Sequence, residues 1–177
     1  MKTQEQRLEA IIASSPVLHG LFRRWALIDL PDLWLSGSAL PQVVWNATFD
    51  LPPHHGLLAD LDLVYFDPDD LSKETEDERN SRLRSVLNDI PLRIDAKNQA
   101  RVHLWYGRRF GYEIAPYQSS EQAISTFPTT SSAIGIRRVG ESLAVYAPFG
   151  LKDLLTPVVR PNKAQITQAI YESKIAR

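Results

Sequence analysis

The segment from Ala59 to Asp67, which reads ADLDLVYFD, constrains the fold of this chain more than any other. Side chains along a strand point alternately to its two faces, so Asp60 and Asp62 share one face, roughly 7 Å apart. Leu61 and Leu63 point to the other face, into a core. Two neighbouring carboxylates lose hydration on burial and repel each other, and a divalent cation between them reverses that repulsion. The segment therefore predicts a strand with a cation site; the alternative is a solvated pair at an exposed strand end.

Hydrophobic periodicity, prolines, glycines and capping residues divide the rest of the chain into helices and strands. Helices are predicted before Ser15, directly after Ser15-Pro16, and over residues 39–48, 72–88, 98–106, 119–126, 149–155 and 162–174. Strands are predicted over residues 32–36, 61–66 and 92–96, and over 133–139 and 142–147, which flank Gly140-Glu141 as a β-hairpin. This order predicts an α/β (α+β) fold with a mixed β-sheet flanked by helices.

Composition excludes several classes of protein. The 177 residues suit one domain with a sizeable core. The absence of cysteine excludes disulfides and cysteine-based zinc sites or nucleophiles. No apolar run approaches about 20 residues, and the polar N-terminal segment lacks the apolar core of a signal peptide. We therefore expect a cytoplasmic protein that does not enter a membrane.

Gly37 and Ser38 separate a short predicted strand from a predicted helix. Glycine lets the backbone approach a phosphate closely. The helix N-terminus that follows offers free N–H donors and a positive dipole end, and the Ser38 hydroxyl adds one more donor. The turn predicts a phosphate-binding element; the alternative is a plain strand-to-helix turn with Ser38 as the N-cap.

Asp95 lies in the predicted strand LRIDA. A third carboxylate from a strand next to Asp60 and Asp62 would complete a two-metal site, or would take a proton from an acceptor hydroxyl as general base. The alternative is an exposed aspartate that pairs with Arg93 or Lys97.

Charge is distributed unevenly along the chain, although the formal net charge is −1. Residues 29–78 contain twelve acidic residues and one basic residue, whereas residues 79–110 contain eight basic and two acidic ones. Lys97 and Arg101 are the first choices for contacts with a triphosphate, since the arginine fork fits phosphate oxygens. In contrast, Arg79, Arg82 and Arg84 are expected to form a solvated helix face.

Two further residue groups have open roles. Asn98 contacts a nucleotide or an acceptor, or else it caps the helix after the strand. Trp105 is expected in the core, while a base-stacking role for Trp105 or Tyr106 has no support from the sequence.

Gly37-Ser38, then Asp60-Leu61-Asp62, then Asp95 on a later strand is an order that resembles the DNA polymerase β-type nucleotidyltransferase superfamily. The chain looks closer still to a bacterial family of nucleotidyltransferase-like proteins of mostly undetermined activity. Four stretches over roughly residues 32–162 carry this resemblance: LWLSGSALPQVVWN, DLDLVYFDPDDLSKETED, DAKNQARVHLWYG and APFGLKDLLTPVVRPN. Their combination is specific, whereas no single stretch is.

The resemblance implies one polymerase β-type nucleotidyltransferase domain over residues 1–177, with the helices of residues 1–30 packed on it. It places Gly37 and Ser38 on the phosphate turn, Asp60 and Asp62 on the metal pair, and Asp95 as the candidate third carboxylate. The implied cofactor is Mg²⁺, as two ions, with Mn²⁺ as the alternative.

Three functions follow as hypotheses. The first is an enzyme that moves a nucleoside monophosphate from a nucleoside triphosphate to a hydroxyl of a small molecule, a protein or an RNA end. The second is a non-catalytic nucleotide- or metal-binding module with the same fold. The third is a metal-dependent phosphohydrolase, which the Gly-Ser turn disfavours. The position of Asp95 relative to the Asp60 and Asp62 pair discriminates between the first two.

Overall fold

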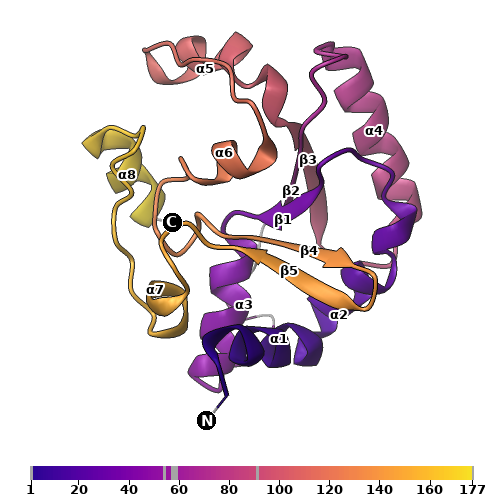
Figure 1. Ribbon diagram of the computed structural model, residues 1–177, viewed down its shortest axis with the longest axis vertical. Coiled ribbons are helices and arrows are strands. Elements are labelled where there is room, and N and C mark those ends of the chain that lie inside the picture. Colours follow the sequence, from indigo (N-terminus) through magenta and orange to yellow (C-terminus); the bar gives the residue numbers. More distant parts are fainter. Residues whose placement is uncertain (1, 54, 57–59, 91, 177) are drawn as a thin grey trace.

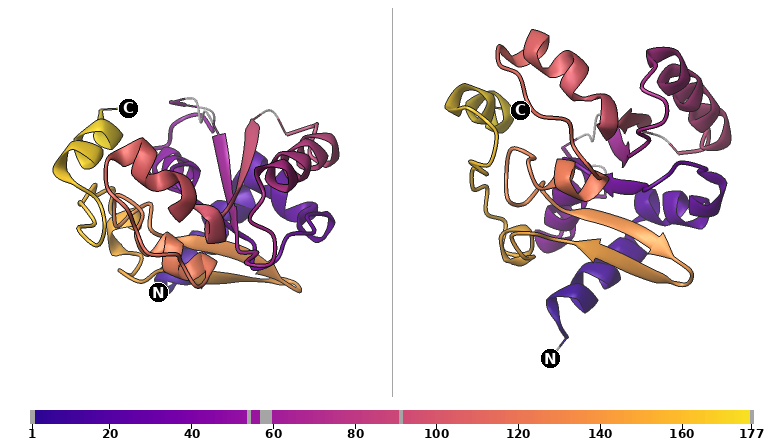
Figure 2. Two further views of the ribbon diagram at one scale, coloured as in Figure 1. Left: turned by 90° about the horizontal axis from the view of Figure 1, so that it is seen from above. Right: turned by 45° about the horizontal axis from the view of Figure 1, so that its top comes forward.

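The structure is a computed structural model that describes residues 2–53, 55–56, 60–90 and 92–176. Within these ranges, five strands form one mixed sheet in the order β3-β2-β1-β4-β5 (Figure 1). The strands are β1 (Trp34–Ser36), β2 (Asp60–Tyr65), β3 (Arg93–Asn98), β4 (Gly135–Val139) and β5 (Ser142–Tyr146). β2 and β3 run parallel, side by side in the left view of Figure 2, and the other neighbouring pairs run antiparallel. The predicted mixed sheet and its C-terminal hairpin are therefore confirmed.

One face of the sheet carries the main hydrophobic core. The helices that contribute to this core are α1 (Gln4–Ser14), α2 (Pro16–Arg23), α3 (Ala39–Thr48), α4 (Lys73–Val86) and α7 (Lys152–Leu155). Leu61 and Leu63 are fully buried in it, which confirms the alternation predicted for β2. Asp60 and Asp62 consequently face the other side of the sheet.

The second face of the sheet is partly covered by α5 (His103–Phe110), α6 (Ser120–Ile124) and the segment that leads into α8 (Gln168–Ile175). Trp34 and Val64 from this face pack against Ile124 of α6. Figure 1 shows α5 and α6 on the side of the sheet away from α1, with α8 beside them. Across the described ranges, every helix is too short or too polar to span a bilayer.

The predicted helix over residues 98–106 is divided in the structure. Asn98 ends β3, and its side chain accepts a hydrogen bond from the backbone N–H of Ala100 at 3.1 Å. That bond starts a 3₁₀ turn, η2 (Gln99–Arg101), and α5 begins only at His103. The capping role considered for Asn98 is therefore confirmed.

The predicted helix over residues 162–174 begins later than expected, at Gln168. The Asn162 side-chain amide donates to the backbone carbonyls of Ser125 and Phe127, and its oxygen accepts from the N–H of Ala164. These local bonds hold the backbone out of a helix, because an asparagine side chain competes for the same polar groups.

The solvated helix face expected for three arginines of α4 is wrong for Arg79. Its guanidinium pairs with Asp67 at 2.6 Å and lies 5.2 Å from the ring centre of Tyr65. Arg82 and Arg84 are exposed, as expected. Arg79 thus links α4 to the end of β2.

Candidate functional site

Asp62 and Asp95 lie directly beside each other on the second face of the sheet. They are register partners in the parallel pair of β2 and β3, and Ser36 is the partner of Asp62 on β1. Neighbouring strands are about 4.8 Å apart, and partners in register point to the same face. Both carboxylates are partly exposed and line the same cavity. The structure therefore brings together two of the three acidic residues predicted for the site.

Asp60 is placed at the edge of this arrangement. It is the first residue of β2, two residues before Asp62 on the same face, and its register partner is Arg93. The Nε atom of Arg93 lies 3.7 Å from Asp60 Oδ1. Asp60 thus has a basic neighbour at the start of the strand, while Asp62 and Asp95 face the cavity.

The turn at Gly37 packs directly against Asp62. Gly37 has a φ of +79°, in the left-handed region that favours glycine. A Cβ atom at this position would lie 2.3 Å from Asp62 Oδ2, which no side chain could tolerate without displacing the carboxylate. Ser38 is exposed, and its hydroxyl makes no capping hydrogen bond to α3. Ser38 is thus the N-cap residue of α3, as the alternative placed it, but its hydroxyl does not bond the helix and is exposed at the turn.

Lys97 supplies a cation next to Asp95. Its Nζ atom lies 3.2 Å from Asp95 Oδ1 and 3.8 Å from Glu76 Oε1. The side chain of Lys97 is 45% exposed, so its ammonium group is free to exchange partners at moderate cost. Lys97 is one of the two partners that the sequence suggested for Asp95 in the absence of a catalytic role.

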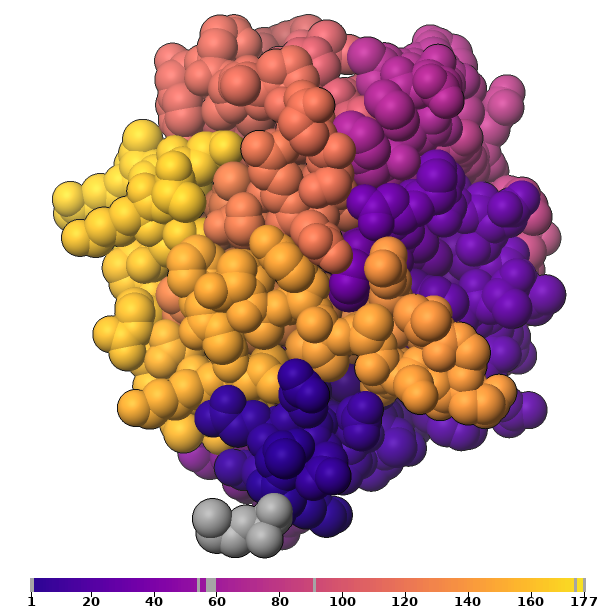
Figure 3. Space-filling view, viewed as in Figure 1, coloured from indigo at the N-terminus to yellow at the C-terminus, as the bar shows by residue number. Residues whose placement is uncertain are grey.

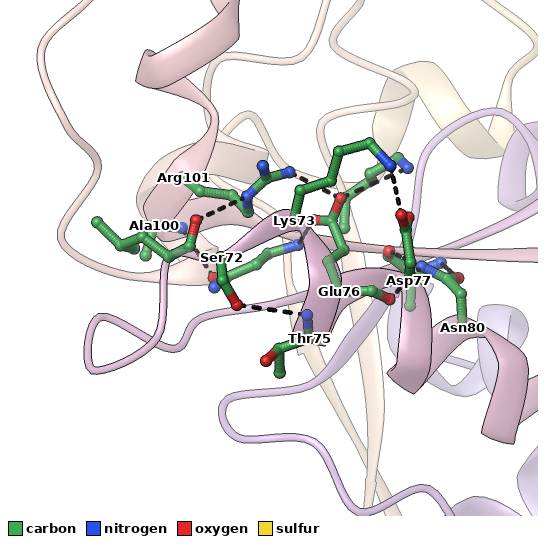
Figure 4. Close-up of polar contacts among 12 residues, drawn as sticks. Ser72, Lys73, Thr75, Glu76, Asp77, Asn80, Ala100 and Arg101 are labelled. Atoms are coloured by element: carbon green, nitrogen blue, oxygen red, sulfur yellow. Dashed lines mark hydrogen bonds and ion pairs between the residues drawn. The ribbon is translucent and has the colours of Figure 1, made fainter.

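Glu76 of α4 anchors the residues that follow Asp95. It is buried, its Oε1 lies 2.9 Å from Arg101 Nη1, and Figure 4 shows the two side chains meeting. Its Oε2 accepts the backbone N–H of Asn98 at 2.8 Å. Arg101 also donates from Nε to the carbonyl of Leu71. Arg101 is thus engaged within the protein, and the nucleotide contact predicted for it stays a prediction.

The side chain of Asn98 is likewise hydrogen-bonded to the backbone around it. Its amide nitrogen donates to the carbonyls of Asp67 and Asp70, and its oxygen accepts the N–H groups of Asp67 and Ala100. These bonds tie the loop after β2 to the end of β3. A direct nucleotide contact of Asn98 also remains untested.

A cavity of about 270 Å³ extends from the two carboxylates to α5 and to the segment after α6. Its aromatic lining consists of Trp105, Tyr106, Phe110, Tyr117 and Phe127. No pattern in the sequence predicts this cavity. The available signal was the density of aromatic residues between positions 105 and 117, in which Tyr106 and Phe110 have the i, i+4 spacing of a helix.

The segment before α8 closes one side of this cavity. Gln165 and Ile166 of this segment and Ile170 of α8 line it, although they are about a hundred residues from Asp62 in sequence. The hydroxyl of Tyr112 donates to the carbonyl of Gln165 at 2.8 Å, which holds the segment against the region after α5. Figure 3 shows the C-terminal part of the chain lying against the part that contains α5 and α6.

The donor set at Asp62 and Asp95 fits a Mg²⁺ ion. This ion prefers oxygen ligands and is commonly held by one or two carboxylates together with substrate phosphates and water. Because residue 37 is a glycine, its backbone approaches the Asp62 carboxylate more closely than a residue with a side chain could. Among the described residues, no three acidic or histidine side chains are arranged to hold an ion by themselves. The site therefore suits an ion shared with a phosphate ligand rather than an all-protein cage.

Comparisons with known proteins support a family assignment. A family model described as nucleotidyltransferase matches residues 23–177. The chain is also similar to a solved structure described as the NMR structure of a protein that reveals a CCA-adding enzyme head domain. That match has 28% sequence identity and a TM-score of 0.78, and it covers 99% of this chain and 90% of the other. No curated protein matches the chain in sequence.

Proposed function

The chain belongs to the nucleotidyltransferase family, and on this premise we propose that it transfers a nucleoside monophosphate from a nucleoside triphosphate to an acceptor hydroxyl with the help of Mg²⁺. The predicted family resemblance and the polymerase β-type fold are both confirmed. The metal, the acceptor and the roles of individual residues belong to the proposal.

The triphosphate would bind where the Gly37 turn meets Asp62. The N-terminus of α3 offers backbone N–H groups and a positive dipole end to the phosphates, and the exposed Ser38 hydroxyl adds a donor. Asp62 and Asp95 would hold the metal together with phosphate oxygens. Bound there, the metal would offset negative charge on the α-phosphate and on the departing pyrophosphate.

The transfer itself exchanges one phosphorus–oxygen bond for another. The acceptor oxygen attacks the α-phosphorus, the bond to the bridging oxygen of the β-phosphate breaks, and pyrophosphate leaves. Asp95 would accept the hydroxyl proton, since its carboxylate lies at the edge of the cavity beside Asp62. Lys97 would then pair with Glu76 or with a phosphate oxygen when Asp95 is engaged.

One observation carries this proposal: Asp62 and Asp95 are aligned in register, and the Gly37 turn packs against the first of them. Calorimetry with a panel of nucleoside triphosphates and Mg²⁺ tests it, on the native chain and on Asp62→Asn and Asp95→Asn. Asp29→Asn is the matched control, because the Asp29 side chain is 86% exposed and does not line the cavity. We expect Mg²⁺-dependent binding that both site variants lose and the control keeps, with pyrophosphate released when an acceptor is supplied. Equal binding by all variants would remove the assignment.

The ion pair between Lys97 and Asp95 favours a second candidate function, a non-catalytic module that binds nucleotide with the same fold. A lysine that stays on Asp95 would prevent it from accepting a proton. Under this alternative the native chain binds triphosphate and Mg²⁺ but releases no pyrophosphate with any acceptor. Binding and pyrophosphate release, measured on one preparation, therefore discriminate between the two.

A further inference from the structure

The cavity beside the two carboxylates is polar at one end and aromatic at the other. Asp62, Asp95 and Lys97 line the end at the sheet. Beyond them the wall is formed largely by aromatic and aliphatic side chains of α5, of the segment after α6 and of the segment before α8. Such a mostly apolar pocket with a few placed polar groups is typical of small-molecule sites.

The aromatic end suits a flat, aromatic ligand. Tyr106 and Phe110 have ring centres 4.5 Å apart, and Trp105 lies next to Tyr106 at 6.2 Å. Nucleobases stack on such rings, and each stacked base contributes substantially to affinity. The volume of about 270 Å³ is near the lower end of the size of ligand pockets, which suits one nucleoside.

Gln165 is the polar residue best placed to form hydrogen bonds with the polar edge of such a ligand. Its side-chain amide lies within 2.8–3.0 Å of the Tyr117 hydroxyl, and that hydroxyl also contacts Thr126 Oγ1 at 2.9 Å. Burial raises the pKa of Tyr117, so the hydroxyl stays protonated at neutral pH. An amide has two donor hydrogens and two acceptor lone pairs, and the tyrosine takes at most one of each. The Gln165 amide therefore keeps one N–H donor and one acceptor lone pair for a ligand. Its contact with the Tyr117 hydroxyl fixes their direction.

We propose that this cavity receives the nucleoside of the triphosphate, with the base among the aromatic side chains of α5 and its polar edge on the Gln165 amide. The inference rests on the proposed function, because it takes the triphosphate to lie at Gly37 and Asp62. It goes further in assigning the site of base recognition to α5 and to the segment before α8. An acceptor molecule in the same cavity is the competing occupant, and it is an outcome of the test below.

The test compares two probes that share a triphosphate and differ in the nucleoside. Calorimetry measures the affinities of Mg²⁺-bound nucleoside triphosphates and of Mg²⁺-bound inorganic tripolyphosphate. Trp105→Ala removes one aromatic wall, and Leu104→Ala is its matched control, because Leu104 is on the same helix but 51% exposed. Ile166 lines the cavity from the segment before α8. Ile166→Trp therefore fills the cavity by adding side-chain volume instead of removing it.

We expect the native chain to bind nucleoside triphosphates more tightly than tripolyphosphate. Trp105→Ala and Ile166→Trp should each weaken nucleoside triphosphate binding roughly tenfold and leave tripolyphosphate binding unchanged. Leu104→Ala should change neither. Gln165→Leu should reduce the difference in affinity among the four bases while the stacking contribution remains.

Three outcomes would overturn the inference. Equal affinity of the native chain for both probes would mean that the nucleoside makes no contact, although the proposed function would stand. Unchanged nucleoside triphosphate binding in both cavity variants, with loss of pyrophosphate release, would assign the cavity to the acceptor. Equal weakening of both probes would show that the cavity affects the phosphate site rather than the nucleoside. Failure of the native chain to bind either probe would instead contradict the proposed function itself.

Discussion

Gly37 and Asp62 are packed so closely that a Cβ atom on the glycine would lie 2.3 Å from the Oδ2 atom of the aspartate. Gly37 directly follows β1, and Asp62 lies in the neighbouring strand β2, where it is the register partner of Ser36. The turn that would receive phosphates and the carboxylate that would hold the metal are therefore one structural unit. A side chain added at residue 37 must therefore displace the Asp62 carboxylate.

Gly37→Ala should remove triphosphate binding and reduce stability. The left-handed backbone at this position costs an alanine about 1–2 kcal/mol, and the clash with Asp62 adds to that cost. Urea unfolding and calorimetry with a Mg²⁺-bound nucleoside triphosphate measure the two effects.

Gly140→Ala separates backbone strain from the clash. Gly140 also has a positive φ, +59°, but an added Cβ would meet no atom within 4 Å. This variant should lose only about 1 kcal/mol of stability and bind triphosphate normally. If the two alanine variants bound triphosphate equally well, the contact between turn and carboxylate would have no functional role.

Lys97→Met should strengthen the binding of Mn²⁺ in the absence of nucleotide. The Lys97 ammonium lies 3.2 Å from Asp95 Oδ1 and competes with a metal for that carboxylate. A partly exposed ion pair of this kind contributes up to about 1 kcal/mol, which corresponds to about a fivefold change in affinity. Titration by calorimetry measures it, with Lys73→Met as the control, because Lys73 pairs with Asp77 on the exposed side of α4. Weaker metal binding by Lys97→Met would contradict the competition.

Glu76→Gln should cost about 3 kcal/mol of unfolding free energy, because it leaves the guanidinium of Arg101 without its buried partner. Figure 4 shows how Glu76 and Arg101 connect α4 to the turn after β3. Glu78→Gln is the control, since Glu78 is exposed on the same helix and should lose less than about 0.5 kcal/mol. Similar urea midpoints for the two variants would show that the buried pair contributes little.

Asp70 should contribute to the free energy of unfolding at neutral pH, and this contribution should disappear in acid. Hydrogen bonds from the Ser72 side chain, the Ser72 backbone and Thr75 lower the pKa of Asp70 to about 2. In the unfolded chain an aspartate titrates near 3.9. Because the folded pKa is the lower one, the contribution is complete above about pH 4 and disappears as the pH falls toward 2. The difference in urea midpoint between the native chain and Asp70→Asn should therefore shrink between pH 6 and pH 2.5, and a constant difference would contradict this.

The local pattern of the sequence was sufficient to predict the strands that carry the site. Alternation in β2 places Leu61 and Leu63 in the core, and it leaves Asp60 and Asp62 on the other face. Helix α3 occupies the residues predicted for it, 39–48, because its apolar face and the preceding glycine turn are both local signals.

Contacts between distant segments could not be predicted in this way. The alignment of Asp62 with Asp95 depends on β3 pairing with β2 in parallel, which no short pattern specifies. The pairing of Arg101 with Glu76 could not be predicted either, because Glu76 lies 25 residues earlier in the chain, on another element. Gln165 lies in a region predicted to be helical. That it lines the cavity and bonds Tyr117 is apparent only from the tertiary contacts.

The proposed metal and triphosphate site is tested most sharply by an NMR experiment in which Mn²⁺ replaces Mg²⁺. This paramagnetic ion broadens the amide signals of nearby residues. With a nonhydrolysable nucleoside triphosphate and Mn²⁺ both present, the account predicts selective loss of the amide signals of Gly37, Asp62 and Asp95, and no such loss in the Asp62→Asn variant. Broadening centred elsewhere, such as on the acidic start of α4, or none at these three residues, would contradict the proposed metal and triphosphate site.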